Sequence, residues 1–442
     1  MTILSKLFGK NNKKTNINIQ FGRFTDAYKH KDKYDAWENS LEYFESGKLT
    51  EAYTSFFQYL KDDEVDNVAL YQSEKGLEFE LFQGSKVING NINNQRVYAE
   101  AKIARSKGLH IGFLRKLLEE NYQLEYCRYA LDDDHQLTAI FTSYTVDASP
   151  YKIYAALKEL ATRVDYNDDL LVDEFSELEP IHNGHIVQNT PDIKKVKHHY
   201  LKQEIKEALQ SIDNAEIDFA RYPGAASFLY LDTLYKIDYL IKPEGHTMEL
   251  IQKYQNLYFN ERSYSPVEKN AELRKGLEEI ASISFEDLEY ELYDVKSTFG
   301  TARSSSIDQA QEFIRSEIKN MDFYIKQIEE DIAISIASYT LGYIIHHYAL
   351  PVPFQKFIHL FYQITEQDYF NALGANIDFI SEAKLSSRGI KKAIKIIIEQ
   401  HDKLYPHISL KGEDLNFDNK AVFCKTYAKM LSNLNFKRAD NR

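Results

Sequence analysis

The sequence predicts an α+β fold, in which an antiparallel-sheet module is followed by a mostly α-helical domain. Apolar and polar residues alternate over residues 66–145, as in half-buried strands, whereas apolar residues recur at helical spacing through most of residues 186–442. The 442 residues also include only 17 glycines and 9 prolines, well below the average of roughly 7% and 5%. Such a composition favours long helices and few loops.

Residues 1–25 are expected to form a flexible tail, and residues 26–62 a helical hairpin. Gly47 is the expected helix stop, because glycine adopts the left-handed cap conformation without strain. Thr50 is the expected N-cap of the second helix. Residues at helical spacing predict the apolar faces of the two helices: Trp37, Leu41, Phe44, Tyr53, Phe56, Phe57 and Leu60.

An α+β module is predicted over residues 63–180, with the element order α-β-β-β-α-β-β-α. Hairpin turns are expected at residues 72–76, at Gly84-Ser85 and at Asn89-Gly90-Asn91, so neighbouring strands should run antiparallel. Strands are predicted at 68–70, 77–81, 95–104, 124–130 and 136–144, and a helix at 109–121. A further helix is expected to begin at Ser149-Pro150 and to bury Ile153, Leu157, Leu160 and Val164.

This order of elements, together with five short segments, resembles the type III secretion chaperone-like fold. The segments are Tyr98–Ala104 (YAEAKIA), Leu114–Tyr126 (LRKLLEENYQLEY), Tyr129–Asp133 (YALDD), Leu157–Ala161 (LKELA) and Asp168–Phe175 (DDLLVDEF). Within that fold the YbjN-type sensory regulators look nearest, and the resemblance covers about residues 50–180. It implies a small protein-binding module, often dimeric and without enzymatic activity. The long segment that follows departs from that family.

Residues 186–442 are predicted to form an all-helical domain of no recognised family, with a sub-boundary near residues 300–305. Thr190-Pro191, Ser265-Pro266 and Ser284 are expected helix starts. The predicted helices are 191–212, 223–242, 246–260, 266–281, 284–296, 306–348, 353–372, 386–404 and 418–434. Within 306–348, a heptad seam is formed by Ile318, Met321, Ile325, Ile328 and Ile332.

Residues 332–355 contain no Asp, Glu, Lys or Arg and are long enough to cross a bilayer. The run nevertheless includes Ser335, His346, His347 and Pro351, which are costly to place in hydrocarbon. A helix buried on all sides in a soluble domain is therefore predicted.

Motifs for phosphate-binding loops, zinc proteases and serine hydrolases (GxGxxG, GxxxxGK[ST], HExxH and GxSxG) do not occur in the sequence. Carboxylates gather at residues 132–134 and 165–174, where hard oxygen ligands could bind Mg²⁺ or Ca²⁺. The first group suits a hairpin turn and the second a solvated acidic rim.

Histidines form two further groups. His182 and His185, extended by His198-His199, could supply part of a zinc site, but surface histidines are favoured. His346, His347 and His359 are expected to be core or boundary residues. The sequence therefore predicts no catalytic, cofactor-binding or metal-binding residues, and no cofactor.

The net charge of −13 argues against a nucleic-acid partner. Basic runs at 194–206 and 384–403 are expected to be the solvated faces of amphipathic helices. Cys127 and Cys424 lie far apart in apolar segments, as reduced, buried thiols of a cytoplasmic protein would.

These features lead us to expect a cytoplasmic, non-enzymatic protein-binding factor, chaperone-like or regulatory, with an unidentified protein partner or a second copy as a homodimer. Two alternatives stay open: an enzyme with a pocket in the helical domain, and a peripheral membrane factor. The latter would use residues 1–14 and helix 386–404 and is the less favoured, so membrane association is not expected.

Overall fold

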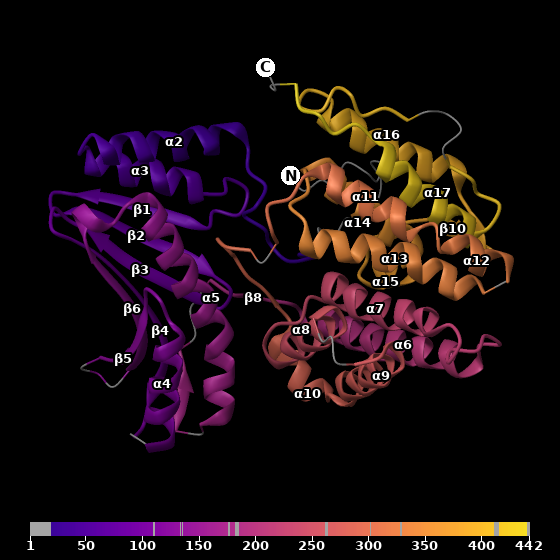
Figure 1. The fold of residues 1–442 in the computed structure, drawn as a ribbon, viewed down its shortest axis with the longest axis horizontal. Helices are drawn as coiled ribbons and strands as arrows, with labels where there is room; N and C mark the ends of the chain where they lie inside the picture. Colours follow the sequence, from indigo (N-terminus) through magenta and orange to yellow (C-terminus); the bar gives the residue numbers. More distant parts are fainter. Residues whose placement is uncertain are drawn as a thin grey trace. The chain divides into compact units, whose positions relative to one another are not determined.

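The computed structural model describes residues 19–108, 111–132, 134, 136–175, 177–181, 185–260, 264–300, 302–327, 329–410 and 415–439 (Figure 1). The chain divides into two compact units. The sheet unit comprises residues 24–188 and 293–301, and the helical unit comprises the described residues before 24 together with those of 189–292 and 302–442. An antiparallel sheet followed by many helices confirms the predicted α+β class.

The sheet unit begins with the predicted helical hairpin. α2 (Lys31–Glu45) ends just before Gly47, whose φ of 76° is the left-handed conformation that suits glycine after a helix. α3 (Leu49–Leu60) has Lys48 as its N-cap residue, without a side-chain cap hydrogen bond. The cap expected at Thr50 is therefore wrong, because Thr50 already lies inside the helix, where its carbonyl accepts from the Thr54 hydroxyl.

Among the described residues, seven strands form an antiparallel sheet in the order β1-β2-β3-β4-β6-β5, and β7 pairs with the end of β4. The strands are β1 (Val68–Ser73), β2 (Gly76–Gln83), β3 (Lys86–Ile92), β4 (Arg96–Ser106), β5 (Arg128–Leu131), β6 (Gln136–Tyr144) and β7 (Leu178–Pro180). Four strands, rather than the three of the predicted order, precede α4 (Ile111–Gln123).

The turn predicted at Asn89-Gly90-Asn91 is wrong, because these residues lie inside β3. Gly90 is the register partner of Phe79 on β2 and of Ala99 on β4. A Cβ atom on Gly90 would lie 2.1 Å from Cζ of Phe79. The glycine therefore provides space for an aromatic ring rather than a turn.

The strand predicted over residues 124–130 begins only at Arg128. The backbone amides of residues 125–127 instead donate to the carboxylate of Glu159 at 2.8–2.9 Å. Because Glu159 is part of α5 (Pro150–Glu174), these three donors are satisfied without a strand partner.

α3 and α5 pack on the same face of the sheet (Figure 1). α5 begins as predicted, since the amide of Lys152 donates to the hydroxyl of Ser149 at 3.3 Å. The predicted inner side of α5 is buried: Ile153, Leu157, Leu160 and Val164. The strand residues that they cover are apolar and buried: Leu77, Phe79, Leu81, Ile88, Val97, Ala99 and Ala101.

A late segment, residues 293–301, completes the sheet unit. The side chain of Gln83 accepts from the amides of Thr298 and Phe299 at 3.1 and 2.9 Å and donates to the carbonyl of Phe299 at 3.2 Å. The amide of Gly300 donates to Asp26 at 2.9 Å. β9 (Tyr293–Asp294) also pairs with β8 (Val187–Gln188). From the sequence, residues 293–301 are expected within the helical domain, 186–442.

The helical unit contains most of the predicted helices at their expected places. They are α6 (Pro191–Asn214), α7 (Pro223–Leu240), α8 (Gly245–Asn260), α9 (Pro266–Ser282), α10 (Phe285–Leu288), α11 (Ile307–Glu317), α12 (Met321–Lys326), α13 (Glu330–His347), α14 (Val352–Thr365), α15 (Gln367–Ala372), α16 (Ser387–His401) and α17 (Lys420–Asn433). A short hairpin joins β10 (Ile380–Ser381) to β11 (Lys384–Leu385). The predicted caps Thr190, Ser265 and Ser284 all accept a backbone hydrogen bond.

Three long helix predictions are wrong. The helix predicted over 353–372 is two helices, α14 and α15, which are separated at Glu366. The helix predicted over 306–348 is three helices, because side chains of α11 bind the carbonyls that end α17: Gln311 donates to Leu431 and Leu434, and Arg315 to Ser432. That anchoring sets the direction of α11, and the chain turns before α13. The predicted heptad seam crosses these breaks, and its member Ile328 lies outside the described residues.

The helix predicted over 284–296 ends at Leu288, and a 3₁₀ turn, Glu289–Glu291, follows. The Glu289 carbonyl accepts from Lys194 at 2.6 Å, and the Glu291 carbonyl accepts from the amide of Glu244 at 3.0 Å. These carbonyls therefore have partners outside a continued helix.

α13 carries most of the uncharged run 332–355, after Glu330 and Asp331 in its first turn. It is buried through most of its length, with Ile332, Ile336, Leu341 and Ile344 inaccessible or nearly so. Its tight packing is visible at Gly342, where a Cβ atom would lie 2.8 Å from Tyr235 and Tyr362 atoms. Within the described ranges, none of the helices combines the length and apolarity that a membrane crossing requires.

Candidate protein-binding surfaces

The face of the sheet opposite α3 and α5, called the open face below, carries polar side chains. Alternate residues of β1 to β4 point to this face, and register places them in rows across the strands. One row consists of Tyr71, Glu78, Asn91 and Tyr98, and the next of Glu80, Asn89 and Glu100. The side chains thus combine carboxylates, amides and phenols on one surface.

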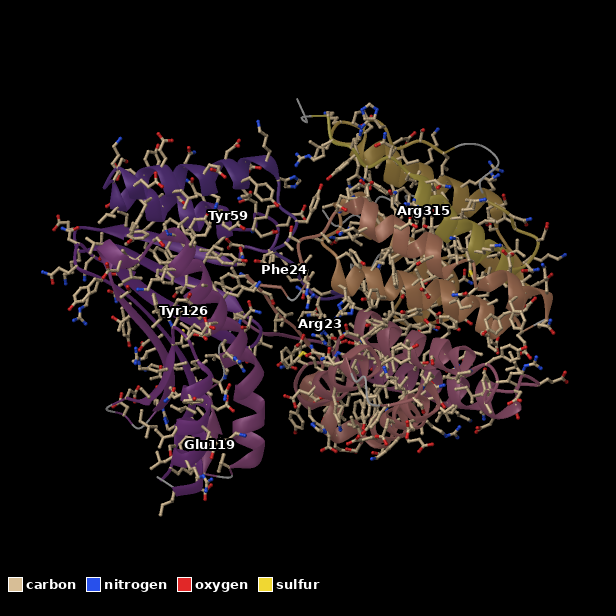
Figure 2. All side chains as sticks on the ribbon, viewed as in Figure 1. Arg23, Phe24, Tyr59, Glu119, Tyr126 and Arg315 are labelled. Carbon is tan, nitrogen blue, oxygen red and sulfur yellow. The ribbon has the colours of Figure 1, made fainter. Side chains whose placement is uncertain are left out.

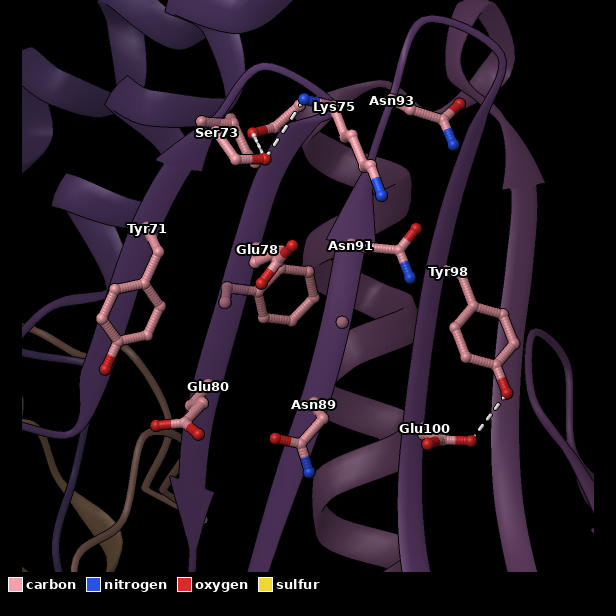
Figure 3. A pocket seen from close by; sticks show the side chains of 14 residues that line it. Tyr71, Ser73, Lys75, Glu78, Glu80, Asn89, Asn91, Asn93, Tyr98 and Glu100 are labelled. Carbon is pink, nitrogen blue, oxygen red and sulfur yellow. Dashed lines mark hydrogen bonds between the residues drawn. The ribbon is translucent and has the colours of Figure 1, made fainter.

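A hollow of about 440 Å³ lies in the open face (Figure 3). Figure 3 shows Tyr71 and Tyr98 at its two sides, with the shorter asparagine side chains of β3 between them. The Tyr98 hydroxyl donates to Glu100 at 2.7 Å, and burial together with this bond raises the pKa of Tyr98 to about 12. Tyr98 is therefore a neutral donor at one wall of the hollow.

The outer side of α4 is the second surface. Ile111, Leu118 and Tyr122 are 85%, 70% and 88% exposed, and Leu114 between them is also exposed. The opposite side of the helix buries Phe113 and Leu117, with the Phe113 ring 5.4 Å from that of Phe175. We call Ile111, Leu114, Leu118 and Tyr122 the outer stripe of α4.

Sequence reasoning missed the outer stripe, although a signal for it was present. The adjacent apolar pairs Phe113-Leu114 and Leu117-Leu118 occupy both sides of a helix, since neighbouring residues are about 100° apart. One member of each pair is buried and the other is exposed. The pairing therefore predicts a helix that has a second apolar side.

The helical unit contains a buried charge cluster around Lys236. Lys236 lies 2.9 Å from Glu204, 3.4 Å from Asp232 and 3.2 Å from Glu366, and Tyr200 donates to Glu366 at 3.0 Å. Burial raises the pKa of Glu204 to about 7 and also raises that of Asp232. Burial alone would lower the pKa of Lys236, but the three carboxylates raise it well above its usual value. Lys236 is thus held charged as the shared partner of the three acids.

A second buried group lies around Asp238. Arg23 donates to its carboxylate at 2.8 Å, and His346 lies 2.9 Å from its other oxygen. Burial would raise the pKa of Asp238, but Arg23 and His346 hold it well below its usual range. The N-terminal segment is thereby fastened to α7, with Gly22 donating to the carbonyl of Tyr239 at 2.8 Å. These contacts give the buried charges of Arg23 and Asp238 a structural role.

The predicted acidic groups divide between turn and helix. The Asp132 side chain accepts from the amides of Asp134 and Gln136 at 2.9 and 2.8 Å, as the predicted hairpin turn requires. Asp133 lies outside the described residues. Residues 165–174 belong to α5, but their side chains are outside the described part of the chain. Among the described residues, no three or more His, Cys, Asp or Glu side chains are arranged to hold a metal ion.

His185 and His198, which were weighed as zinc ligands, each contact another group within their own unit. His185 lies 3.0 Å from the carbonyl of Gly84, and His182 is outside the described residues. The His198 ring packs edge-on to Phe285 at 5.3 Å, and His199 is exposed.

The histidines expected in the core do lie there or at its boundary. His347 Nε2 is hydrogen-bonded to the hydroxyl of Tyr235 at 2.9 Å, and His359 Nδ1 to the hydroxyl of Tyr239 at 3.0 Å. Burial lowers the pKa of His347 to about 4 and that of His359 to about 3. Both are therefore neutral hydrogen-bond partners of tyrosines.

The cysteines and the basic runs also have structural roles. Cys127 and Cys424 are free and buried, and burial raises the pKa of both thiols. In the first basic run, Lys202 donates to the carbonyls of Ala281 and Ile283 at the end of α9. In the second, the apolar side of α16 is buried in the core: Ile390, Ala393, Ile394 and Ile397.

Figure 2 places Glu119 on α4, the helix of the outer stripe, in the sheet unit.

No protein-family model matches the chain, and no curated protein matches it either.

Proposed function

We propose that the chain is a non-enzymatic protein-binding factor of the chaperone-like or regulatory kind, and that two copies pair through α4. The observation that carries the proposal is the outer stripe of α4, where three large apolar side chains are at least 70% exposed. Contiguous apolar side chains of this kind mark protein-interaction sites, because leaving them in water is unfavourable.

A second copy is the partner that the charges around the stripe suit best. Arg115 and Glu119 flank the stripe and are both exposed, and they lie 3.0 Å apart on the same helix. When two identical helices pack antiparallel about a two-fold axis, Arg115 of each copy lies toward Glu119 of the other. The charges that flank the stripe are therefore complementary to those of a second copy, as an isologous interface requires.

The resemblance to the type III secretion chaperone-like fold, of the YbjN type, supports the same proposal, since that family's modules bind proteins and are often dimeric. The sheet unit has a helical hairpin followed by strands and two further helices, an order that suits such a module. A cytoplasmic location is part of the proposal, and it is supported by the two free, buried cysteines, since reducing compartments keep thiols in this state.

The oligomeric state of the full chain tests the proposal. Sedimentation or light scattering should give a dimer for the unaltered chain and a monomer for Leu118→Glu, with the same helical content. Val146→Glu is the matched control, since Val146 is 71% exposed in the same unit but outside α4. A chain that stays monomeric at every concentration, or a dimer that Leu118→Glu leaves intact, contradicts pairing through α4.

A further inference from the structure

Four polar side chains in the lining of the hollow have no partner within the described protein. In the described part of the chain, the side chains of Glu78, Glu80, Asn89 and Asn91 make no hydrogen bond or ion pair with the protein. Among the described lining residues there are three carboxylates and one lysine, Lys75 in the β1–β2 turn. The hollow thus presents unneutralised negative charge together with free amide donors and acceptors.

The hollow owes its shape to side chains of different length. Tyr71 is on β1 and Tyr98 on β4, the strands on either side of the β2–β3 pair, and Asn91 of β3 lies between them in the same row. Tyr71 is 56% exposed, so the face of its ring is accessible. The short asparagine side chains between the two tyrosines leave a trough in the open face.

The carboxylates have a regular spacing along the trough. Glu78 and Glu80 are two residues apart on β2, which places their side chains on one face about 7 Å apart. Alternate residues of an extended peptide repeat at the same distance. A peptide lying along the strands can therefore place a cationic side chain opposite each carboxylate.

We propose that the hollow binds an extended segment of a partner polypeptide that carries arginines at alternate positions, and this inference rests on the protein-binding function proposed above. A guanidinium group can bind both the carboxylates and the tyrosine rings of the lining, since it forms paired hydrogen bonds with carboxylates and stacks on aromatic rings. The asparagines of β3 supply hydrogen bonds to the backbone of the bound segment. The charge of the hollow and the spacing of Glu78 and Glu80 select a basic segment over a neutral or acidic one.

Titration of the full chain with fluorescent peptides tests this inference. A peptide with arginine at every second residue should bind, and its counterpart with glutamate at those positions should not. Glu78→Gln combined with Glu80→Gln should weaken binding by about tenfold or more, because two charge-assisted contacts are lost. The isosteric changes preserve strand geometry.

A matched control removes equal charge elsewhere in the same unit. Glu38→Gln combined with Glu42→Gln, both exposed on α2, should leave the affinity unchanged. Tyr98→Leu should weaken binding of the arginine peptide more than binding of a lysine peptide, because a guanidinium group loses its stacking on the tyrosine ring. A Leu118→Glu chain should still bind the peptide, so that failure of the hollow and failure of pairing through α4 are told apart.

Three results would overturn the inference. One is the absence of binding by the arginine peptide. Another is equal weakening by the α2 control, which would mean that net charge alone attracts the peptide. The third is saturable binding of a neutral oligosaccharide in the hollow, lost in the Glu78/Glu80 double variant, without binding of the peptide.

Discussion

Lys236 of α7 donates to the carboxylate of Glu204 of α6 at 2.9 Å inside the helical unit. The same ammonium group also lies within 3.4 Å of Asp232 and Glu366. One cation therefore balances three acids that come from three parts of the chain. This arrangement makes the helical unit sensitive both to the loss of the lysine and to pH.

Removing the cation should destabilise the helical unit strongly. Lys236→Met leaves three buried carboxylates without their partner and should lower the free energy of unfolding by about 3–5 kcal/mol. Denaturant titration followed by circular dichroism measures this change. Lys395→Met is the control, because Lys395 pairs with Glu399 on the exposed side of α16 and should change the midpoint little. Similar midpoints for the two variants would refute the role given to Lys236.

Replacing Glu204 should alter the pH dependence of stability. Burial raises the pKa of Glu204 from 4.5 to about 7, so the folded chain holds its proton more firmly than the unfolded chain. The stabilisation from this proton is fully present below about pH 4.5 and is lost as the pH rises to about 7. Glu204→Gln removes this dependence, and its stability relative to the unaltered chain should rise by roughly 2–3 kcal/mol between pH 4.5 and 8.

Thermal or denaturant unfolding at a series of pH values gives the comparison for Glu204→Gln. Glu399→Gln serves as control, since it removes an exposed carboxylate of the same unit. A constant difference between Glu204→Gln and the unaltered chain across this pH range would contradict the buried, protonated state of Glu204.

Gly90 of β3 should tolerate no side chain. Because a Cβ atom there would lie 2.1 Å from Phe79, Gly90→Ala should destabilise the sheet unit by about 1–3 kcal/mol. Trp37 is the only tryptophan of the sequence and lies in the sheet unit, so its fluorescence reports unfolding of that unit. Gly108→Ala is the control, since open space surrounds that position.

A double variant distinguishes crowding from loss of backbone freedom at Gly90. Adding Phe79→Leu should cost less in the Gly90→Ala chain than in the unaltered chain, because the shorter side chain relieves the contact. Additive effects of the two substitutions would mean that the ring does not occupy the space at Gly90.

Gln83 should be essential for holding residues 293–301 on the sheet unit. Gln83→Leu leaves the buried amides of Thr298 and Phe299 without acceptors, and we expect a loss of about 2–4 kcal/mol. Gln72→Leu, at an exposed position of β1, is the comparison. Faster proteolysis within residues 293–301 should accompany the loss in Gln83→Leu alone, and equal cleavage in both variants would exclude this role.

Local signals predicted much of the fold. The caps Ser149, Thr190 and Ser265 mark real helix starts, and alternation placed β6 at residues 136–144 without error. Each depends on residues within a few positions of one another. Two of the errors, at Asn89-Gly90-Asn91 and within 306–348, occurred where distant partners decide the backbone: Phe79 in one case and the end of α17 in the other.

The candidate surfaces were less accessible to sequence reasoning. Glu78, Glu80, Tyr98 and Glu100 lie in strands that the sequence predicts, whereas Asn89 and Asn91 were predicted in a turn. The rows that these residues form depend on register between strands. The outer stripe of α4 was missed for another reason. Helical spacing shows on which side of a helix the apolar residues lie, but it does not show whether another element covers that side.

By itself the sequence determined the α+β class, the scarcity of loops and most helix positions, because periodicity and caps act over one or two turns. The tertiary structure alone decided which of two apolar sides of α4 is covered, which acids share Lys236, and that residues 293–301 complete the sheet unit. Those outcomes depend on burial and on hydrogen bonds between residues up to 274 positions apart. Local sequence carries no information about such partners until the chain has folded.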